Sequence, residues 1–388
     1  MTAFGDYQLE IYGRGLGGER PELPILYADL EARARETLKP EAYAYVAGGA
    51  GEGRTISANR AAFDRWRLVP RMLGDVTTTD LSTTLFGTKF CAPVLLGPVG
   101  VLSILHAEAE LAVARAAAEI GLPMCLSTAA STSMEDVAAA LGETPRWYQL
   151  YWPSDPELAA SLAQRAEAAG YEAIVVTLDT RFMPWRPEDL AGAYLPFLLG
   201  EGLANYTSDP VFRSRLSAAP EEDMLPSIQQ WATIFPNRGL DWNDLPTLRE
   251  HTDLPILVKG ILTAEDAQRA VDLGVDGVIV SNHGGRQVDC SVAALDQLPS
   301  VVEAVGNDVP VLLDSGVRTG SDVLCALALG ARAVLVARPW ALALGLAGQA
   351  GVTQVLRALL ADLDLTLAMC GLTSIEAVDR ELVLPAPR

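Results

Sequence analysis

The stretch Gly277-Val278-Ile279-Val280-Ser281-Asn282-His283-Gly284-Gly285-Arg286-Gln287 joins a short apolar run to a polar, glycine-rich loop. The apolar run is typical of a strand that is buried on both faces, and the loop would leave from its carboxyl end. His283 and Arg286 form a candidate catalytic pair within this loop. An imidazole can take up a proton near neutral pH, and a guanidinium can bind a carboxylate through two parallel hydrogen bonds. A structural loop histidine beside a surface arginine is the alternative interpretation.

The same unit recurs from about residue 93 onwards: a short apolar run, a polar loop, and then an amphipathic or alanine-rich helix. Alternating strands and helices predict a parallel sheet. Eight units in roughly 250 residues are typical of a (β/α)8 TIM barrel. A doubly wound open sheet is the alternative, but no GxGxxG motif follows the first strand. The expected strands are Pro93–Gly97, Pro123–Leu126, Trp147–Tyr151, Ala173–Leu178, Pro255–Val258, Gly277–Val280, Val309–Leu313 and Ala333–Ala337. Helices expected between them include Glu108–Ile120, Pro156–Ala169, Ala264–Leu273 and Ser321–Leu329.

Two parts of the chain fall outside this repeat. Residues 1–92 are expected to form an N-terminal helical extension that packs on the barrel of residues 93–388. Short helices are predicted over Tyr27–Thr37 and Pro40–Ala47, followed by an extended piece. The connection between the fourth and fifth strands, about residues 187–244, is far longer than an ordinary βα loop and contains several aromatic residues. Loops of this length are usually functional or disordered, and the aromatic residues favour a lid.

The composition excludes several classes of partner. The chain of 388 residues carries a formal net charge of -20, which argues against nucleic acid or an anionic membrane surface. Its five cysteines include no CxxC pair, so we expect reduced thiols and no metal site. The N-terminal residues lack the pattern of a signal peptide, and the apolar stretches are too short to cross a membrane. These features predict a cytoplasmic protein.

Polar residues follow nearly every expected strand. Because TIM barrels place their chemistry at the carboxyl ends of the strands, these residues should converge on one rim. Taken singly, Thr177 could be a buried hydroxyl and Asp314 a helix cap, but their convergence predicts an active site. The residues expected at this rim are Pro98, Val99, Gly100, Ser127, Thr128, Gln149, Tyr151, Thr177, Asp179, Arg186, Lys259, Ser281, His283, Asp314 and Arg338.

The last two units contain a candidate phosphate site. Gly316 and Arg318 follow the seventh strand and Arg338 follows the eighth, where barrels often bind phosphate through backbone N–H groups and a helix N-terminus. Lys259 and several hydrogen-bonding side chains would lie nearby. A phosphorylated cofactor with a hydrogen-bonding ring is therefore indicated, and FMN fits this description. Pyridoxal phosphate bound to Lys259 is the alternative.

The chain resembles the FMN-dependent 2-hydroxy acid oxidases and dehydrogenases over nearly its whole length. The matching stretches are Tyr45–Gly49, Gly97–Gly100, Tyr148–Tyr151, Val176–Thr180, Leu254–Gly260, Ser281–Gln287 and Asp314–Arg318, in the family's order. Within the family, lactate 2-monooxygenases are most similar in Gly5–Tyr7, Glu10–Gly13, Trp185–Pro187, Asn205–Tyr206 and Asp209–Phe212. This resemblance implies oxidation of lactate by O2 to acetate, CO2 and water.

The resemblance also implies roles for individual residues. His283 would take the proton from the substrate's Cα–OH, and Asp179 would stabilise the resulting imidazolium. Arg186 and Arg286 would hold the substrate carboxylate. Lys259 would lie beside the N1–C2=O edge of the flavin and stabilise negative charge on the reduced ring. The substrate would also receive hydrogen bonds from Tyr45 and Tyr151.

The remaining residues would contact FMN. Ala337 stands where the family usually has glycine, and Ala129 replaces a bulkier residue common in family pockets, which implies a roomier substrate pocket. Contacts with the ring or ribityl chain are implied for Pro98, Val99, Gly100, Thr128, Gln149, Thr177 and Ser281. Contacts with the ribityl chain or phosphate are implied for Asp314, Gly316, Arg318, Ala337 and Arg338.

The expected partners are a small 2-hydroxy carboxylate and O2, and the family resemblance implies a homotetramer or homo-octamer. An oxidase or dehydrogenase that releases the 2-keto acid, with an aryl or long-chain substrate, is the first alternative. An FMN-dependent isomerase of the isopentenyl-diphosphate type is the second. A barrel kept for flavin storage or scaffolding is the third.

Overall fold

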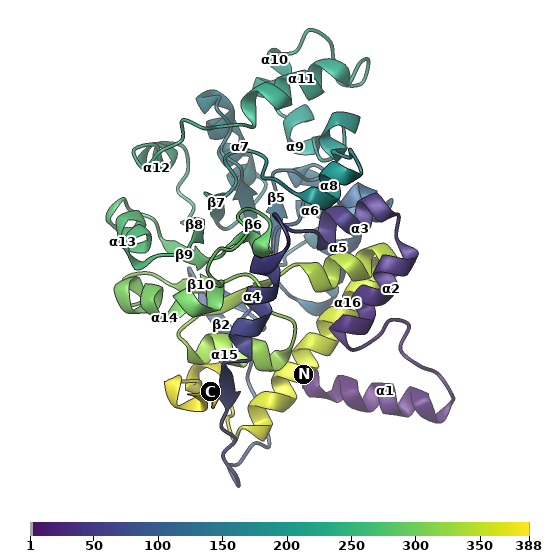
Figure 1. The fold of residues 1–388 in the computed structure, drawn as a ribbon, viewed down its shortest axis with the longest axis vertical. Helices are drawn as coiled ribbons and strands as arrows, with labels where there is room; N and C mark the ends of the chain where they lie inside the picture. Colours follow the sequence, from purple (N-terminus) through teal and green to yellow (C-terminus); the bar gives the residue numbers. More distant parts are fainter. Residues whose placement is uncertain (1–2, 388) are drawn as a thin grey trace.

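The computed structural model describes residues 3–387, and its centre is a closed barrel of eight parallel strands (Figure 1). The strands are β4 (Val94–Leu96), β5 (Met124–Ser127), β6 (Arg146–Leu150), β7 (Ile174–Thr177), β8 (Ile256–Ile261), β9 (Gly277–Val280), β10 (Val311–Leu313) and β11 (Ala333–Val336). β11 pairs with β4 and closes the barrel. Each expected strand overlaps one of these, although β5, β6 and β8 extend beyond the expected ranges, and the TIM barrel is confirmed over the open sheet.

The strands are apolar because helices cover the outside of the barrel while side chains fill its inside. The covering helices are α5 (Ala109–Ile120), α6 (Met134–Leu141), α7 (Pro156–Ala168), α13 (Ala264–Asp272), α14 (Ala294–Val305), α15 (Gly320–Ala328) and α16 (Arg338–Met369). Four of them begin at side chains that accept hydrogen bonds from the first turn, namely Ser133, Asp155, Thr263 and Thr319. The four helices expected from the sequence lie within one residue of their expected ends.

A hairpin closes the amino-terminal end of the barrel. β2 (Thr83–Leu85) and β3 (Thr88–Phe90) pair antiparallel. Leu85 and Phe90 belong to a buried cluster that takes at least one residue from each barrel strand, including Trp147 of β6. The barrel interior is therefore a packed core, and an open site remains only at the other end of the strands.

The N-terminal residues are more helical than expected. α2 (Tyr27–Thr37) and α3 (Pro40–Ala47) have the expected bounds. The extended piece expected after them is wrong in part, because α4 (Arg54–Phe63) lies there, before β1 (Trp66–Leu68) pairs with β12 (Val383–Pro385). An unexpected α1 (Tyr7–Leu16) projects from the side of the molecule in Figure 1.

The long connection between β7 and β8 is built from short helices rather than open loop. They are α8 (Pro187–Ala191), η3 (Pro196–Leu199), α9 (Ala204–Thr207), α10 (Pro210–Ser214), α11 (Leu225–Ile234) and α12 (Leu245–Leu248). Figure 1 shows α9, α10 and α11 at the end of the molecule opposite the C-terminus. Among residues 3–387, no helix is both long and apolar enough to span a bilayer.

Candidate active site

A cavity opens at the carboxyl ends of the strands, and most of the expected site residues line it. These are Tyr45, Pro98, Val99, Gly100, Tyr151, Arg186, Lys259, His283, Arg286, Asp314, Gly316, Arg318, Ala337 and Arg338. Ser127 lines it as well. The others lie at or just after the carboxyl ends of the same strands without lining the cavity, namely Thr128, Gln149, Thr177, Asp179 and Ser281. The convergence expected from the barrel is therefore present.

His283 and Asp179 form a pair between the ends of β9 and β7. His283 Nδ1 lies 2.8 Å from Asp179 Oδ1, and the Thr180 hydroxyl also contacts both groups. The carboxylate favours the proton on Nδ1, so Nε2 is left with the free lone pair. His283 has a φ of 57°, a left-handed conformation that a non-glycine residue rarely adopts outside functional sites.

Burial sets the charge state of this pair. Burial lowers the pKa of His283 below its usual value, although the charge of Asp179 opposes this shift. For Asp179 burial acts in the raising direction, but the charges of His283 and Lys259 outweigh it and lower the pKa. At neutral pH the pair is therefore a neutral imidazole beside a carboxylate, which is the state that a general base requires.

Lys259 lies next to this pair on β8. Its Nζ is 3.1 Å from Asp314 Oδ2, which also accepts a hydrogen bond of 2.6 Å from the Ser281 hydroxyl. Burial opposes the charged form, but the carboxylates of Asp314 and Asp179 outweigh it and raise the pKa of Lys259. A protonated amine cannot form a Schiff base, so this environment argues against pyridoxal phosphate.

Two arginines, the buried Arg186 and the partly buried Arg286, give the cavity positive charge. Arg186 Nε donates to the carbonyl oxygen of Arg286 at 3.2 Å, and Arg286 Nη1 donates to that of Gly48 at 2.7 Å. Burial, and next the charge of Arg186, lower the pKa of Arg286 to about 9, so the guanidinium stays charged at neutral pH. In a chain of net charge -20, this pair is a local site for a carboxylate.

The two arginines expected at the phosphate end of the cavity both contact protein groups. Arg338 donates to the carbonyl oxygens of Val46, Gly284 and Gly48 at 3.1, 2.8 and 3.3 Å, so its guanidinium ties α3 to the His283 loop. Arg318 lies over the ring of Tyr27, with its Cζ 4.2 Å from the ring centre. Its buried Nε has no hydrogen-bond partner among residues 3–387.

The strand ends fit a cofactor with a hydrogen-bonding ring. Gln149 Nε2 and Thr177 Oγ1 are buried, and neither has a hydrogen-bond partner within residues 3–387. Buried polar groups are seldom left without one. Gly316, with a φ of 96°, and the N-terminus of α16 lie at the other end of the cavity, where a phosphate could bind. These residues fit FMN: Gln149 and Thr177 would contact the ring, and Gly316 and Arg318 would lie beside the phosphate.

Sequence reasoning missed several residues of the site. Gln287 Nε2 donates to the carbonyl oxygen of Asp179 at 2.9 Å and contacts the Thr180 hydroxyl. Gln287 and Thr180 each lie next to a predicted site residue in the sequence, Arg286 and Asp179. This adjacency is the signal by which the sequence could have indicated them. Phe197 and Phe235 line the cavity from the long connection. The aromatic content of this segment favoured a lid, but the sequence did not indicate which aromatic residues would reach the cavity.

Known proteins are similar to this chain over most of its length. The family model of FMN-dependent dehydrogenases matches residues 34–385. An FMN-dependent alpha-hydroxy acid dehydrogenase of Penicillium citrinum is 44% identical over 384 residues, which cover 97% of this chain and 95% of that protein. An L-lactate oxidase of Lysinibacillus sphaericus is 44% identical over 355 residues, which cover 92% and 91%.

The fold also matches solved structures. The crystal structure of mandelate oxidase with (S)-4-hydroxymandelic acid has a TM-score of 0.83 and 39% identity, and the match covers 94% of this chain and 100% of that one. The family model, the relatives and the solved structures all agree with FMN, the cofactor that the cavity fits. The chain belongs to the family of FMN-dependent 2-hydroxy acid dehydrogenases and oxidases, and FMN is its cofactor.

Proposed function

We propose that this FMN-dependent 2-hydroxy acid oxidoreductase oxidises an (S)-2-hydroxy acid with O2 as the electron acceptor. One observation carries the proposal: a neutral histidine held by a carboxylate lies in the same cavity as two arginines. This combination provides a base for the Cα–OH and an anchor for the neighbouring carboxylate. An isomerase acting on a diphosphate would have no use for the base and carboxylate anchor together.

Each polar side chain of the cavity has a separate role in the proposed reaction. FMN, when bound, would supply the two-electron acceptor for the Cα hydrogen and its bonding electron pair. Arg286 and Arg186 hold the substrate carboxylate, which directs the Cα–OH towards Nε2 of His283. His283 takes the hydroxyl proton, and Asp179 stabilises the imidazolium that forms. Burial raises the pKa of Tyr45 to about 12, so its phenol remains a hydrogen-bond donor to the substrate at neutral pH.

For the outcome of the reaction we propose that of a lactate 2-monooxygenase. Aromatic residues of the long connection support this choice. Phe197 stacks on Trp231 at 4.5 Å, Trp231 on Phe235 at 5.1 Å, and Phe235 meets the edge of Tyr151 at 5.7 Å, between ring centres. This aromatic cluster over the cavity would retain the keto acid beside the cofactor. Oxidative decarboxylation requires that the keto acid stays bound until oxygen has reacted.

A plain oxidase that releases the 2-keto acid is the second candidate, and the small Ala129 in the cavity wall favours it. Ala129 leaves room for an aryl or long-chain substituent. Relatives named as L-lactate oxidase and structures of mandelate oxidase are in keeping with either substrate size. A homotetramer or homo-octamer remains our proposal from the family resemblance, and a cytoplasmic location remains our proposal from the sequence composition.

The product mixture separates the two candidates. During aerobic turnover of (S)-lactate, we expect acetate and CO2 in proportion to the O2 consumed, with little pyruvate or peroxide. The same measurement with (S)-mandelate and a long-chain 2-hydroxy acid would rank the substrates. Pyruvate and peroxide formed in amounts equal to the O2 consumed would identify a plain oxidase instead.

The pH dependence tests the pair of His283 and Asp179. Because His283 must be neutral to act, kcat/KM should rise with pH through a pKa below the ordinary histidine value and then stay level around neutrality. Asp179→Asn removes the charge that raises this pKa, so the acidic limb should move to lower pH while the plateau falls. An acidic limb that moved to higher pH in this variant would contradict the assignment.

A further inference from the structure

The loop between β5 and α6 supports both the expected cofactor site and the substrate cavity. Ser127 and Ala129 line the cavity, and Thr128 is fully buried between them. The Ser127 hydroxyl donates to Oε1 of Gln149 at 3.0 Å, and the Thr128 hydroxyl donates to the Gln149 carbonyl oxygen at 2.6 Å. The backbone N–H of Tyr151 in turn donates to the Thr128 hydroxyl at 3.0 Å. The residues Ser127–Ala129, called the corner below, therefore set the orientation of the Gln149 amide and the position of the backbone at Tyr151, directly after β6.

Asn205 in α9 satisfies the backbone of this corner. Its Nδ2 donates to the carbonyl oxygens of Ser127 and Thr128, each at 3.2 Å, and its Oδ1 accepts from the backbone N–H of Met134 at 2.8 Å. The residue is fully buried. The Ser127 carbonyl also accepts from the Ala130 N–H at 3.2 Å, whereas Asn205 is the side chain that donates to the Thr128 carbonyl. Because a buried carbonyl without a donor is costly, Asn205 contributes to the conformation of this loop from a distant segment of the chain.

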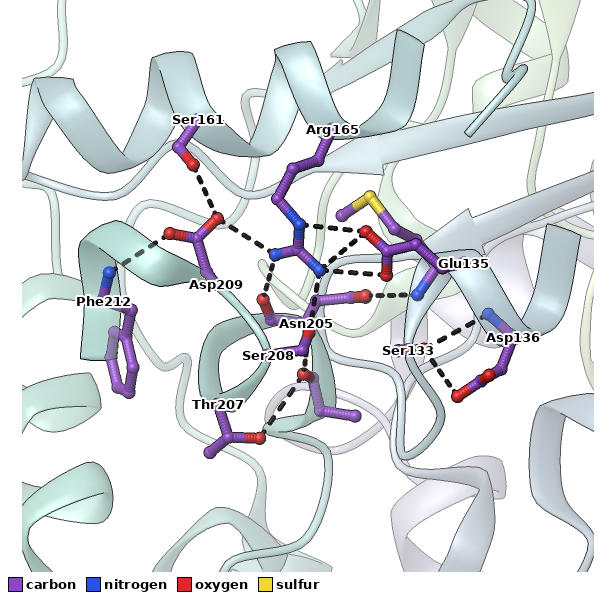
Figure 2. A network of polar contacts seen from close by, with 12 residues as sticks. Ser133, Glu135, Asp136, Ser161, Arg165, Asn205, Thr207, Ser208, Asp209 and Phe212 are labelled. Carbon is purple, nitrogen blue, oxygen red and sulfur yellow. Dashed lines mark hydrogen bonds and ion pairs between the residues drawn. The ribbon is translucent and has the colours of Figure 1, made fainter. Parts of the chain in front are cut away.

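A network of charged groups holds Asn205 in place from the other side (Figure 2). Arg165 of α7 donates to the Asn205 carbonyl oxygen at 2.9 Å, to Asp209 Oδ2 at 3.0 Å and to the Ser208 hydroxyl at 2.8 Å. It also forms a bidentate ion pair with the carboxylate of Glu135, in which both N–O distances are 3.0 Å. Asp209 is fully buried and caps α10. The backbone of α9 at Asn205 is therefore held against α7, which fixes the point from which the Asn205 side chain reaches the corner.

We propose that Asn205 is a positioning residue for the cofactor and substrate sites. It acts through the Ser127–Ala129 corner: through Ser127 it orients Gln149, whose Nε2 has no protein partner within residues 3–387, and it fixes the Ala129 wall. This inference rests on the proposed placement of FMN and substrate in the cavity. The competing explanation is that Asn205 only attaches the long connection to the barrel.

The test uses Asn205→Ala and Asn205→Asp in the full-length protein. FMN is titrated into the cofactor-free protein and followed by flavin fluorescence, and the visible spectrum of the bound flavin is recorded. We expect Kd for FMN to rise about tenfold, equivalent to about 1.4 kcal/mol, together with a shifted visible spectrum. Asn205→Asp keeps the acceptor for Met134 but turns a carboxylate oxygen towards two carbonyls, so it should be at least as impaired as Asn205→Ala.

Phe212→Leu is the matched control. Phe212 is fully buried in α10 and packs against the Tyr206 ring at 5.5 Å, so its truncation weakens the same segment without touching the corner. It should lower Tm while leaving the FMN Kd and the flavin spectrum unchanged. If the Asn205 variants showed the same Kd and spectrum as Phe212→Leu, Asn205 would be an attachment point only, and the inference would be overturned.

A measurement on the unaltered protein covers the case in which neither Asn205 variant folds. Amide hydrogen exchange of the peptide that contains Met134 should slow when FMN binds, and by more than exchange in α10. Equal exchange with and without FMN would also overturn the inference. Failure of the unaltered protein to bind FMN would instead refute the placement of the cofactor, whatever the role of Asn205.

Discussion

His283→Gln is expected to fold and bind FMN, yet to reduce its flavin about 10²–10⁴ times more slowly with substrate. The physical reason is that glutamine keeps a polar side chain at this position but cannot take up the proton of the Cα–OH. Single-turnover reduction of the bound flavin, followed without oxygen in a stopped-flow instrument, measures this step directly.

His251→Gln is the control for this substitution, because His251 lies in η4 (Arg249–His251) and does not line the cavity. Its flavin should be reduced at the native rate. A His283→Gln protein that reduced its flavin as fast as the native enzyme would show that His283 is not the base.

Arg286→Lys should lower kcat/KM by roughly a hundredfold, chiefly through a higher KM. Lysine retains the charge but cannot form two parallel hydrogen bonds to a carboxylate, and one hydrogen bond to a charged group contributes about 1.5–3 kcal/mol. The substitution also removes the bond from Arg286 to the Gly48 carbonyl. Steady-state kinetics with a 2-hydroxy acid, beside the binding of its 2-keto acid, measures the effect.

Arg213→Lys offers a comparison on the same chain. Arg213 makes a similar two-pronged contact with Glu221, at 2.8 and 2.9 Å, but it lies at the surface of the long connection. This substitution should leave kcat/KM unchanged. Equal kinetics for Arg286→Lys and the native protein would rule out carboxylate binding by Arg286.

The sequence predicts the barrel and most of its rim because both rest on local signals. Each strand is a short apolar run, since its two faces are covered by helices and by the packed interior. Once the strands are located, the carboxyl-end rule places residues such as Lys259 and Asp314 on one rim without further information. The structure brings these two within 3.1 Å of each other.

The helix α4 shows why the N-terminal part was harder to predict. Its buried face contains Thr55 and Asn59, which are polar, so the sequence shows no apolar stripe. Asn59 instead exchanges two hydrogen bonds of 2.8 Å with Asn282, next to His283. The helix is therefore defined by partners more than two hundred residues away, and no local pattern reveals them.

The sequence predicts the position of the long connection, but not its short helices or how it attaches to the barrel. Its attachment depends on Arg165, Asn205 and Asp209, polar residues that on sequence grounds would be placed at the surface. Their burial follows from a network that exists only in the folded protein. The aromatic residues were noticed, but which of them would reach the cavity depended on this anchoring.

The most direct test of the central claim is anaerobic reduction of the bound flavin by the two enantiomers of one 2-hydroxy acid. In the proposed site Arg186 and Arg286 would fix the carboxylate and His283 the hydroxyl, so that only one enantiomer would present its Cα–H to the flavin. The account predicts rapid loss of the oxidised flavin band with (S)-lactate and little change with (R)-lactate. Equal rates with both enantiomers, or no reduction by any 2-hydroxy acid, would contradict it.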